Sequence, residues 1–292
     1  MKISIRFYND HEVRAVWEEA TSKWYYSVLD VIGAFNMQDD YGKNRNYWKY
    51  LKAKLKKESS QVVSATTQLK LVAPDGKRHL TDVMDMDTVR LLAMSFPNNR
   101  SMAFIDWLTR SDNSIDGQSR KKAYALFESG ILDSIPAGTI VGLQQIHGYL
   151  FEGLYDFAGK IRERTIWKDG TLFCRVEYLK CNLEEVEKMP QNTFDEIVSK
   201  YVEMNVCHPF MEGNGRSARI WLDLMFKKSL KRCVDWSKID KTDYLNAMRK
   251  SMTDSSDIRR LLASALTDDI TSRELFMKGI DYSYYYEQED NA

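Results

Sequence analysis

Two patterns of apolar residues divide the chain. In the first ~110 residues, strand signals alternate with helical ones, and Ile3, Ile5 and Phe7 recur at every second position. From about residue 121 the pattern is helical almost throughout. Between the two, residues 111–118 (SDNSIDGQ) show no periodicity and carry turn formers. We therefore expect a small α+β domain followed by a mainly α domain.

Composition supports a folded chain with no net charge. Its 292 residues are 43% apolar, which suffices for packed cores, and the length suggests two domains. Lys plus Arg equals Asp plus Glu at 42 each, so any attraction to nucleic acid or membrane must come from a local patch. No apolar run approaches the ~18 residues of a membrane span, and the charged N-terminus does not resemble a signal peptide. The four cysteines form no CxxC pair. We expect a cytoplasmic protein with no membrane partner.

The first domain contains one strongly basic helix. A helix is expected to open at Asp30, and a second covers residues 43–57, which hold seven basic residues and no acid. Tyr47, Leu51 and Leu55 recur at helical spacing in that segment, so they are expected to pack while the lysines face water.

The second domain contains one interruption of its helical pattern. Thr193 and Glu196 form a capping box that starts a helix, and Pro209 ends that helix or lies just past it. Residues 165–178 instead alternate as a strand does, around the turn signal Asp169-Gly170. They predict a β-hairpin.

The segment 207–226, CHPFMEGNGRSARIWLDLMF, carries the residues suited to chemistry. A loop with two glycines, Gly213 and Gly215, leads into an apolar helix at 220–226. Glycines let backbone N–H groups approach an anion closely, and a helix start adds unpaired donors with a favourable dipole. The segment therefore predicts an anion site.

The charged residues of this segment refine that prediction. Arg216 and Arg219 are three apart and share a helix face, which suits a polyphosphate. Glu212 is placed to hold Mg²⁺, and His208 is the nearby group that titrates around neutrality. These residues are the parts needed for phosphoryl or nucleotidyl transfer. Each has an ordinary explanation alone, as a turn, a surface arginine or a helix-terminal histidine, and no Walker loop is present.

A family resemblance supports the conjunction. HPFMEGNGRSAR resembles the Fic signature HPFx[D/E]GNGRxxR and matches it at every specified position. AYALFESG, LQQIHGYLFEGLYDFAGKIRE and WLDLMF also resemble Fic sequence, so the likeness covers most of 121–290. It implies a helical catalytic domain at 121–275 with a β-hairpin flap, preceded by the domain at 1–112. It further implies transfer of AMP from ATP, with Mg²⁺, to a Ser, Thr or Tyr hydroxyl of a target protein, and a homo-oligomer.

The resemblance also implies a role for each motif residue. His208 would be the base, and Glu212 would hold Mg²⁺. The hairpin resembles the family's flap, and its Lys168 is assigned to the ATP site. The remaining ATP-binding residues would be the anion hole formed by the N–H groups of Gly213, Asn214 and Gly215, then Arg216 on the phosphates and Arg219 on the γ-phosphate. His147 is expected to be structural.

The C-terminal residues 276–292 resemble an inhibitory helix and tail. Ser283 and Glu287 fit the motif [S/T]xxxE[G/N], except that Gln288 follows where Gly or Asn is usual. In such relatives the glutamate pairs with the second motif arginine, here Arg219. We also hypothesise that Tyr284 is a self-modification site.

Three alternatives stay open. Relatives that transfer a γ-phosphate carry Lys where Gly215 stands, so Gly215 favours AMP transfer, while phosphocholine transfer and removal of AMP stay open.

Residues 3–110 resemble the Bro N-terminal domain through IRFYNDHEVRAVW, YWKYLKAKLKKE and FPNNRSMAFIDWL. That resemblance implies DNA binding through the basic segment. The second interpretation is therefore a DNA-binding regulator whose Fic module senses nucleotide.

Overall fold

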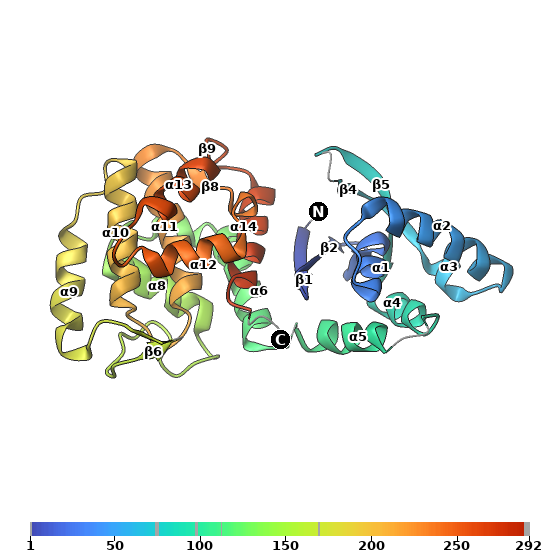
Figure 1. Ribbon diagram of the computed structural model, residues 1–292, viewed down its shortest axis with the longest axis horizontal. Helices are drawn as coiled ribbons and strands as arrows, with labels where there is room; N and C mark the ends of the chain where they lie inside the picture. Colours follow the sequence, from blue (N-terminus) through green and yellow to red (C-terminus); the bar gives the residue numbers. More distant parts are fainter. Residues whose placement is uncertain (1, 74–75, 97–98, 112, 169, 289–292) are drawn as a thin grey trace. The chain divides into compact units, whose positions relative to one another are not determined.

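The computed structural model describes residues 2–73, 76–96, 99–111, 113–168 and 170–288, without the side chains of Lys2 and Lys168 (Figure 1). These residues form two compact units, one ending at Ser114 and one running from Ile115 to Gln288. Asp112, within the expected seam, and residues 289–292 of the expected tail lie outside the described residues.

The first unit is built on an antiparallel sheet. Its five strands lie in the order β1-β2-β3-β5-β4. The turn between β1 and β2 places Asn9 and Asp10 at positive φ, as a tight two-residue hairpin turn requires. The strands are β1 (Lys2–Tyr8), β2 (His11–Glu18), β3 (Lys23–Ser27), β4 (Thr67–Val72) and β5 (Arg78–Asp85).

Five helices share one core with this sheet. They are α1 (Val28–Asn36), α2 (Tyr41–Lys57), α3 (Gln61–Ala65), α4 (Met86–Ala93) and α5 (Arg100–Ser111). All five contribute to one buried cluster with Val13, Ala15 and Met84 of the sheet. Arg14 of the sheet and Asp30 of α1 form a two-bond ion pair, with both N–O distances 2.7 Å, which fixes α1 against β2.

Two expectations for the first unit were wrong. Helix α1 begins at Val28 and not at Asp30, because Ser27 is its N-cap and accepts a hydrogen bond from the Asp30 N–H. In α2 the packed face is Trp48, Leu51 and Leu55 with Asn44, while Tyr47 lies at the edge and remains 37% exposed. The indole of Trp48 donates to Asp82, which anchors α2 to β5.

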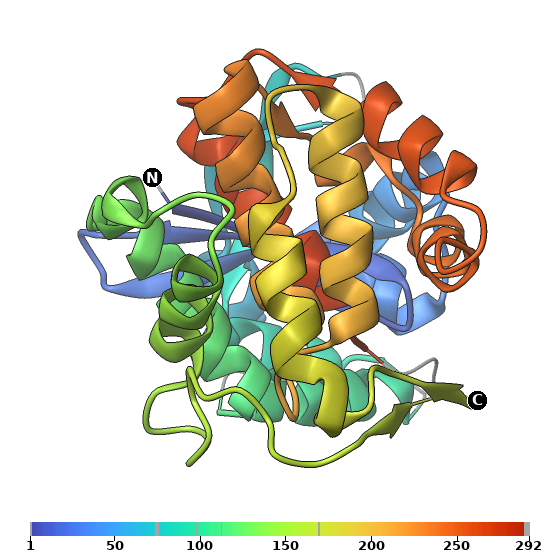
Figure 2. The same cartoon turned by 90° about the vertical axis from the view of Figure 1, so that its left-hand side faces the viewer.

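The second unit is helical, and its described residues include two short antiparallel strand pairs. Helix α11 (Asn214–Leu230) is buried over most of its length and contacts α8, α10 and α14. Figure 2 shows α9 and α10 lying side by side in this unit. The other elements are α6 (Ile115–Glu128), α7 (Ile131–Ser134), α8 (Ile140–Phe151), β6 (Trp167–Lys168), β7 (Thr171–Leu172), α9 (Val176–Lys188), α10 (Phe194–Cys207), β8 (Cys233–Val234), η1 (Trp236–Lys238), α12 (Lys241–Lys250), α13 (Ser256–Ala265), β9 (Leu266–Thr267) and α14 (Arg273–Tyr285).

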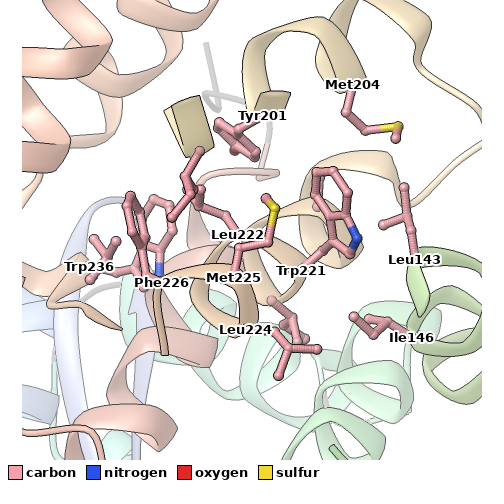
Figure 3. Close-up of a cluster of buried hydrophobic side chains, with 14 of the residues drawn as sticks. Leu143, Ile146, Tyr201, Met204, Trp221, Leu222, Leu224, Met225, Phe226 and Trp236 are labelled. Atoms are coloured by element: carbon pink, nitrogen blue, oxygen red, sulfur yellow. The ribbon is translucent and has the colours of Figure 1, made fainter. Parts of the chain in front are cut away.

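Apolar side chains surround α11. Because water is excluded from almost every side of this helix, any polar group on it needs a partner from a neighbouring element. The indole N–H of Trp221, for example, donates to the Thr139 carbonyl at 3.0 Å. Figure 3 shows the core that α11 shares with α8 and α10, with Leu143, Ile146, Tyr201, Met204, Trp221, Leu222, Leu224, Met225, Phe226 and Trp236 labelled.

The outcome for the second unit is mixed. The capping box of Thr193 and Glu196 is confirmed, and Pro209 lies two residues past the end of α10. The hairpin expected within 165–178 is present but shorter: in the described part of this segment residues 167–168 pair with 171–172, and the Phe173 N–H donates to the Ile166 carbonyl. Val176 already starts α9, whose buried Leu179, Leu183 and Val186 follow helical spacing. The loop before α11 is also shorter than expected, because Asn214 and Gly215 belong to the helix.

The expected mainly helical chain with an N-terminal sheet is confirmed. Every helix in the described parts of the chain is too short or too polar to cross a membrane. The assignment of the first unit to the Bro type stays a prediction.

Replacing Phe104 with Ala should destabilise the first unit. Phe104 is fully buried and its ring packs against Tyr8 and Phe35, so its loss should cost about 3–5 kcal/mol. Urea unfolding followed by circular dichroism should show an early transition that the native chain lacks. Tyr50→Ala, at a residue 71% exposed, is the control and should leave the curve unchanged. An unchanged midpoint in Phe104→Ala would contradict this core.

Candidate active site

The loop between α10 and α11 begins at His208 in the left-handed conformation, with φ 47° and ψ 64°. Its N–H closes α10 on the Met204 carbonyl, and its ring stacks on Phe173 at a centroid distance of 3.7 Å. Phe173 directly follows strand β7 of the hairpin. The ring of His208 therefore lies beside the end of the hairpin, at the start of the loop.

Arg162 fixes the backbone on both sides of His208. Its backbone N–H donates to the Pro209 carbonyl, and its guanidinium donates to the carbonyls of His208, Cys207 and Cys174. Burial lowers the pKa of Arg162, and the carbonyl oxygens satisfy its N–H groups. Sequence reasoning missed this residue because a lone arginine 46 positions before the motif gives no local signal.

His147 and Asn214 hold the loop from inside. The Asn214 amide bonds both backbone groups of Phe210, at 2.8 and 2.7 Å. His147 stacks on the Phe210 ring and receives the Gly159 N–H at Nδ1, so its Nε2 carries the proton and donates to the Glu212 carbonyl at 2.9 Å. The expected structural role of His147 matches this geometry.

Arg216 is enclosed in the first turn of α11. It is 3% exposed, and its guanidinium lies over the rings of Phe151 and Tyr284. One terminal nitrogen, Nη2, donates to Glu212 at 2.9 Å, and the other, Nη1, forms an ion pair with Asp116 of α6. Burial would lower the pKa of Arg216, but Asp116 and the other nearby negative groups raise it above its usual value, so the guanidinium stays charged.

Arg219, one turn later, is held by α14. It is 2% exposed. Its Nε donates to the Ser283 hydroxyl at 2.7 Å, and its Nη2 donates to the Ser283 carbonyl at 2.7 Å and to Glu287 at 2.5 Å. Its Nη1 reaches the Tyr244 hydroxyl at 3.4 Å. The structure thus brings together Arg219, Ser283 and Glu287, which the sequence motif had paired.

Glu287 lies just beyond the end of α14, and the following turn is anchored. The Tyr286 hydroxyl donates to the carbonyls of Trp236 and Ile239. Lys241 of α12 donates to the Gln288 carbonyl at 2.7 Å. Because the backbone carbonyl makes this contact, Gln288 meets it as well as Gly or Asn would.

The structure contradicts the hypothesis that Tyr284 is modified. Its side chain is 4% exposed, and its hydroxyl is hydrogen-bonded to Ser119 of α6 at 2.5 Å. Burial raises the pKa of Tyr284 to about 12, so its phenol is a poor nucleophile here. The polar sequence of the tail suggested exposure, but α14 packs this tyrosine inward.

One expected site residue, Lys168, is only partly described. Lys168 lies in strand β6, and its side chain is not described; Asp169 lies outside the described residues. Glu212 is about 43% exposed at its side chain and also accepts from the Gly213 N–H. Among the described residues, no three His, Cys, Asp or Glu side chains converge as a metal cluster. A Mg²⁺ ion held by Glu212 would therefore need phosphate oxygens and water as its other ligands, as Mg²⁺ commonly has.

Comparison with known proteins assigns the core of this unit. Residues 139–226 match the model of the Fic/DOC family. The chain is 26% identical over 147 residues to the protein adenylyltransferase VbhT of Bartonella schoenbuchensis, covering 46% of this chain and 30% of VbhT. It is 27% identical over 169 residues to the probable protein adenylyltransferase Fic of Salmonella typhimurium, covering 52% of this chain and 84% of that protein.

Among solved structures, the BepC protein of Bartonella tribocorum with bound AMPPNP is 20% identical to this chain, over 52% of this chain and 84% of BepC, with a TM-score of 0.45. The sequence comparisons thus show a match of residues 139–226 to the Fic/DOC family, and the relatives of this chain are named as protein adenylyltransferases. It spans about a third of the length of VbhT.

His147 should make stability depend on pH. Burial, its largest effect, lowers the pKa of His147 from 6.5 to about 4. The unfolded chain therefore takes up this proton near pH 6.5 and the folded chain only near pH 4, so stability falls as pH drops through that window. The loss should approach roughly 3 kcal/mol at its lower end. Urea midpoints at pH 7 and pH 4.5, compared between the native chain and His147→Asn, measure it. An equal drop in both proteins would exclude His147 as the source.

Proposed function

We propose that this chain is a protein adenylyltransferase that transfers AMP from ATP to a Ser, Thr or Tyr hydroxyl of a target protein. The observation that carries the proposal is the segment 208–219. It forms a loop held by Asn214 and the start of α11. His208 begins the loop, Glu212 lies near its end, and Arg216 and Arg219 lie in the helix. The names of the relatives support the same reaction class.

The helix start is suited to phosphates. Gly213, the N-cap of α11, supplies no side-chain cap to the first N–H groups of the helix, and N–H groups at a helix start suit an anion. Gly213 has φ 81°, and an added Cβ would overlap the Phe151 ring, so only glycine fits. The Nε of Arg216 is buried and makes no hydrogen bond within the part of the chain that the structure describes. That leftover donor also suits a phosphate oxygen.

The residues can divide the reaction as follows. His208 takes the proton of the target hydroxyl, whose oxygen attacks the α-phosphorus. The bond from the α-phosphorus to its bridging oxygen breaks, and pyrophosphate leaves. Glu212 would hold Mg²⁺, which when bound neutralises charge on the phosphates. Arg216 and the N–H groups at the start of α11 would orient the phosphates.

Glu287 acts in this proposal as an inhibitor. The γ-phosphate requires Arg219, but Ser283 and Glu287 occupy both the Nε and the Nη2 of that side chain. A bidentate guanidinium edge can serve one anion at a time. The Glu287 carboxylate therefore competes with the nucleotide for Arg219, and the native chain is autoinhibited.

The test uses ATP labelled at the α-phosphate, with Mg²⁺, in lysate of the host. Glu287→Gly should label protein about tenfold or more above the native chain, because a charge-assisted contact of roughly 1.5–3 kcal/mol no longer competes. Adding His208→Ala should lower that labelling by about 10²–10⁴-fold. Gln288→Gly is the matched control and should behave as the native chain, since the backbone of Gln288 makes its contacts with Tyr285 and Lys241.

Each other result has a defined meaning. Equal labelling by the native chain and Glu287→Gly would remove the inhibitory role and leave the transferase. No label in any variant would reject AMP transfer, while ATP binding without label would favour a nucleotide-sensing module. Release of AMP from labelled protein would indicate the reverse reaction.

Helix α2 favours a second activity, DNA binding. Six of its seven basic residues are exposed, and the seventh, Lys52, is paired with Asp82. The helix has no acidic residue, so its water-facing side is positive and can contact phosphates without reading sequence.

Filter binding of duplex DNA tests this activity. We expect affinity to fall between 50 and 200 mM salt, and Lys54→Glu with Lys56→Glu to weaken binding by about tenfold or more. Lys188→Glu, at an exposed lysine of α9, is the control. Equal binding by the native chain and the double variant would reject a role for α2.

A further inference from the structure

Helix α6 lies against the site and is held to α14 by polar contacts one turn apart. Ser119 bonds Tyr284, Arg120 and Tyr124 contact Asp281, and Glu128 pairs with Arg273. These residues share one face of α6 at the spacing of three and four that a helix requires. The same face begins with Asp116, one turn before Ser119 and Arg120, and Asp116 forms its ion pair with Arg216 of α11.

Asp116 is one of two carboxylates on the buried Arg216. Asp116 binds Nη1, and Glu212 binds Nη2. Both carboxylate side chains are about half exposed, whereas the arginine side chain is 4% exposed. A buried charge that loses its partners is costly, and among the described residues Asp116 and Glu212 are the two carboxylates that form ion pairs with Arg216.

Glu212 cannot always serve as that partner. Its Oε1 atom accepts from both the Gly213 N–H and Arg216. The proposed function assigns the same carboxylate to Mg²⁺, and a cation would draw it away from the guanidinium. With Glu212 as the sole partner, metal binding would leave Arg216 uncompensated.

We propose that Asp116 is a positioning residue, which keeps Arg216 charged and oriented while Glu212 is released to hold the metal. This inference rests on the proposed function. Asp116 binds no phosphate or metal in it. It acts through Arg216, and its contribution is to remove the competition between the arginine and the metal for Glu212.

The contrast with Arg219 argues against Asp116 as a second inhibitor. Arg219 has its Nε and Nη2 taken by the tail, so its phosphate-binding edge is used up. Arg216 has only its two terminal nitrogens engaged, and its Nε N–H makes no bond among the described residues. Asp116 therefore holds Arg216 and leaves a donor over, whereas Glu287 occupies the edge that a phosphate would use.

The experiment is done in the full chain carrying Glu287→Gly. The first readout is the Mn²⁺ concentration that gives half-maximal binding in the presence of ATP. Electron paramagnetic resonance of the free ion measures it, and it needs no catalysis. The second is the Mg²⁺ concentration that gives half-maximal AMP transfer. Asp116→Asn should raise both concentrations by about tenfold and lower kcat/KM, because Glu212 then serves two cations. Asp116→Glu should restore most of the affinity.

Glu128→Gln is the matched control on the same helix. It removes the ion pair between α6 and α14 but does not touch Arg216, so the metal dependence should stay at the background value. If Asp116→Asn does not fold, judged by its melting curve, Asp116→Ser removes the same charge and takes the same two readouts.

The outcomes separate the inference from its premise. Unchanged Mn²⁺ binding in Asp116→Asn overturns the inference, and so does an equal shift in Glu128→Gln, which would mean a general loosening of α6. Higher activity of Asp116→Asn without Glu287→Gly would make Asp116 an inhibitor and also overturn it. If the Glu287→Gly background transfers no AMP, the proposed function fails, while Mn²⁺ binding still decides the role of Asp116.

Discussion

Two guanidinium groups buried on one central helix impose the main constraint on this structure. Arg216 and Arg219 lie on α11, which is enclosed by apolar side chains, and both are almost inaccessible to water. A buried charge must be paired and hydrogen-bonded, because water cannot compensate it. The neighbouring elements therefore need carboxylates and carbonyls at these two positions. Helix α6 supplies Asp116, α14 supplies Ser283, and Glu287 follows α14.

The two arginines have partners of different kinds. Asp116 lies in the first turn of α6, next to residues that hold this helix to α14, so Arg216 depends on an element inside the fold. Glu287 lies beyond the last residue of α14, where its position depends on the anchors at Tyr286 and Gln288. A partner beyond the last turn of a helix is easier to displace than one inside a helix. This difference agrees with the proposed roles, orientation for Arg216 and regulation for Arg219.

How far the sequence predicts the site depends on separation along the chain. The segment 208–219 is contiguous, so its loop, its helix and its arginines could be expected directly, and the motif at 283–287 led to Arg219. Arg162, Asp116 and the details of His147 could not be foreseen. Each is a single polar residue that reaches the loop only through the packing of distant helices, and Asp116 lies 100 positions from Arg216. Tyr284 failed for the same reason, since only tertiary packing turns it inward.

In the proposed function, inhibition and substrate binding would be linked through one side chain, Arg219. Because Arg219 is buried, removing Glu287 does not simply free it; it leaves a charge that requires another anion. In the proposed function the γ-phosphate would be that anion, so nucleotide binding and release of Glu287 would be one exchange at Nε and Nη2. The balance between the two states depends on the difference between the free energies with which Arg219 binds the two anions, not on the strength of either contact alone. The anchors at Tyr286 and Lys241 hold the Glu287 turn through backbone carbonyls of Trp236, Ile239 and Gln288. In the proposed mechanism these contacts would favour the inhibited state without taking a hydrogen-bond donor of Arg219.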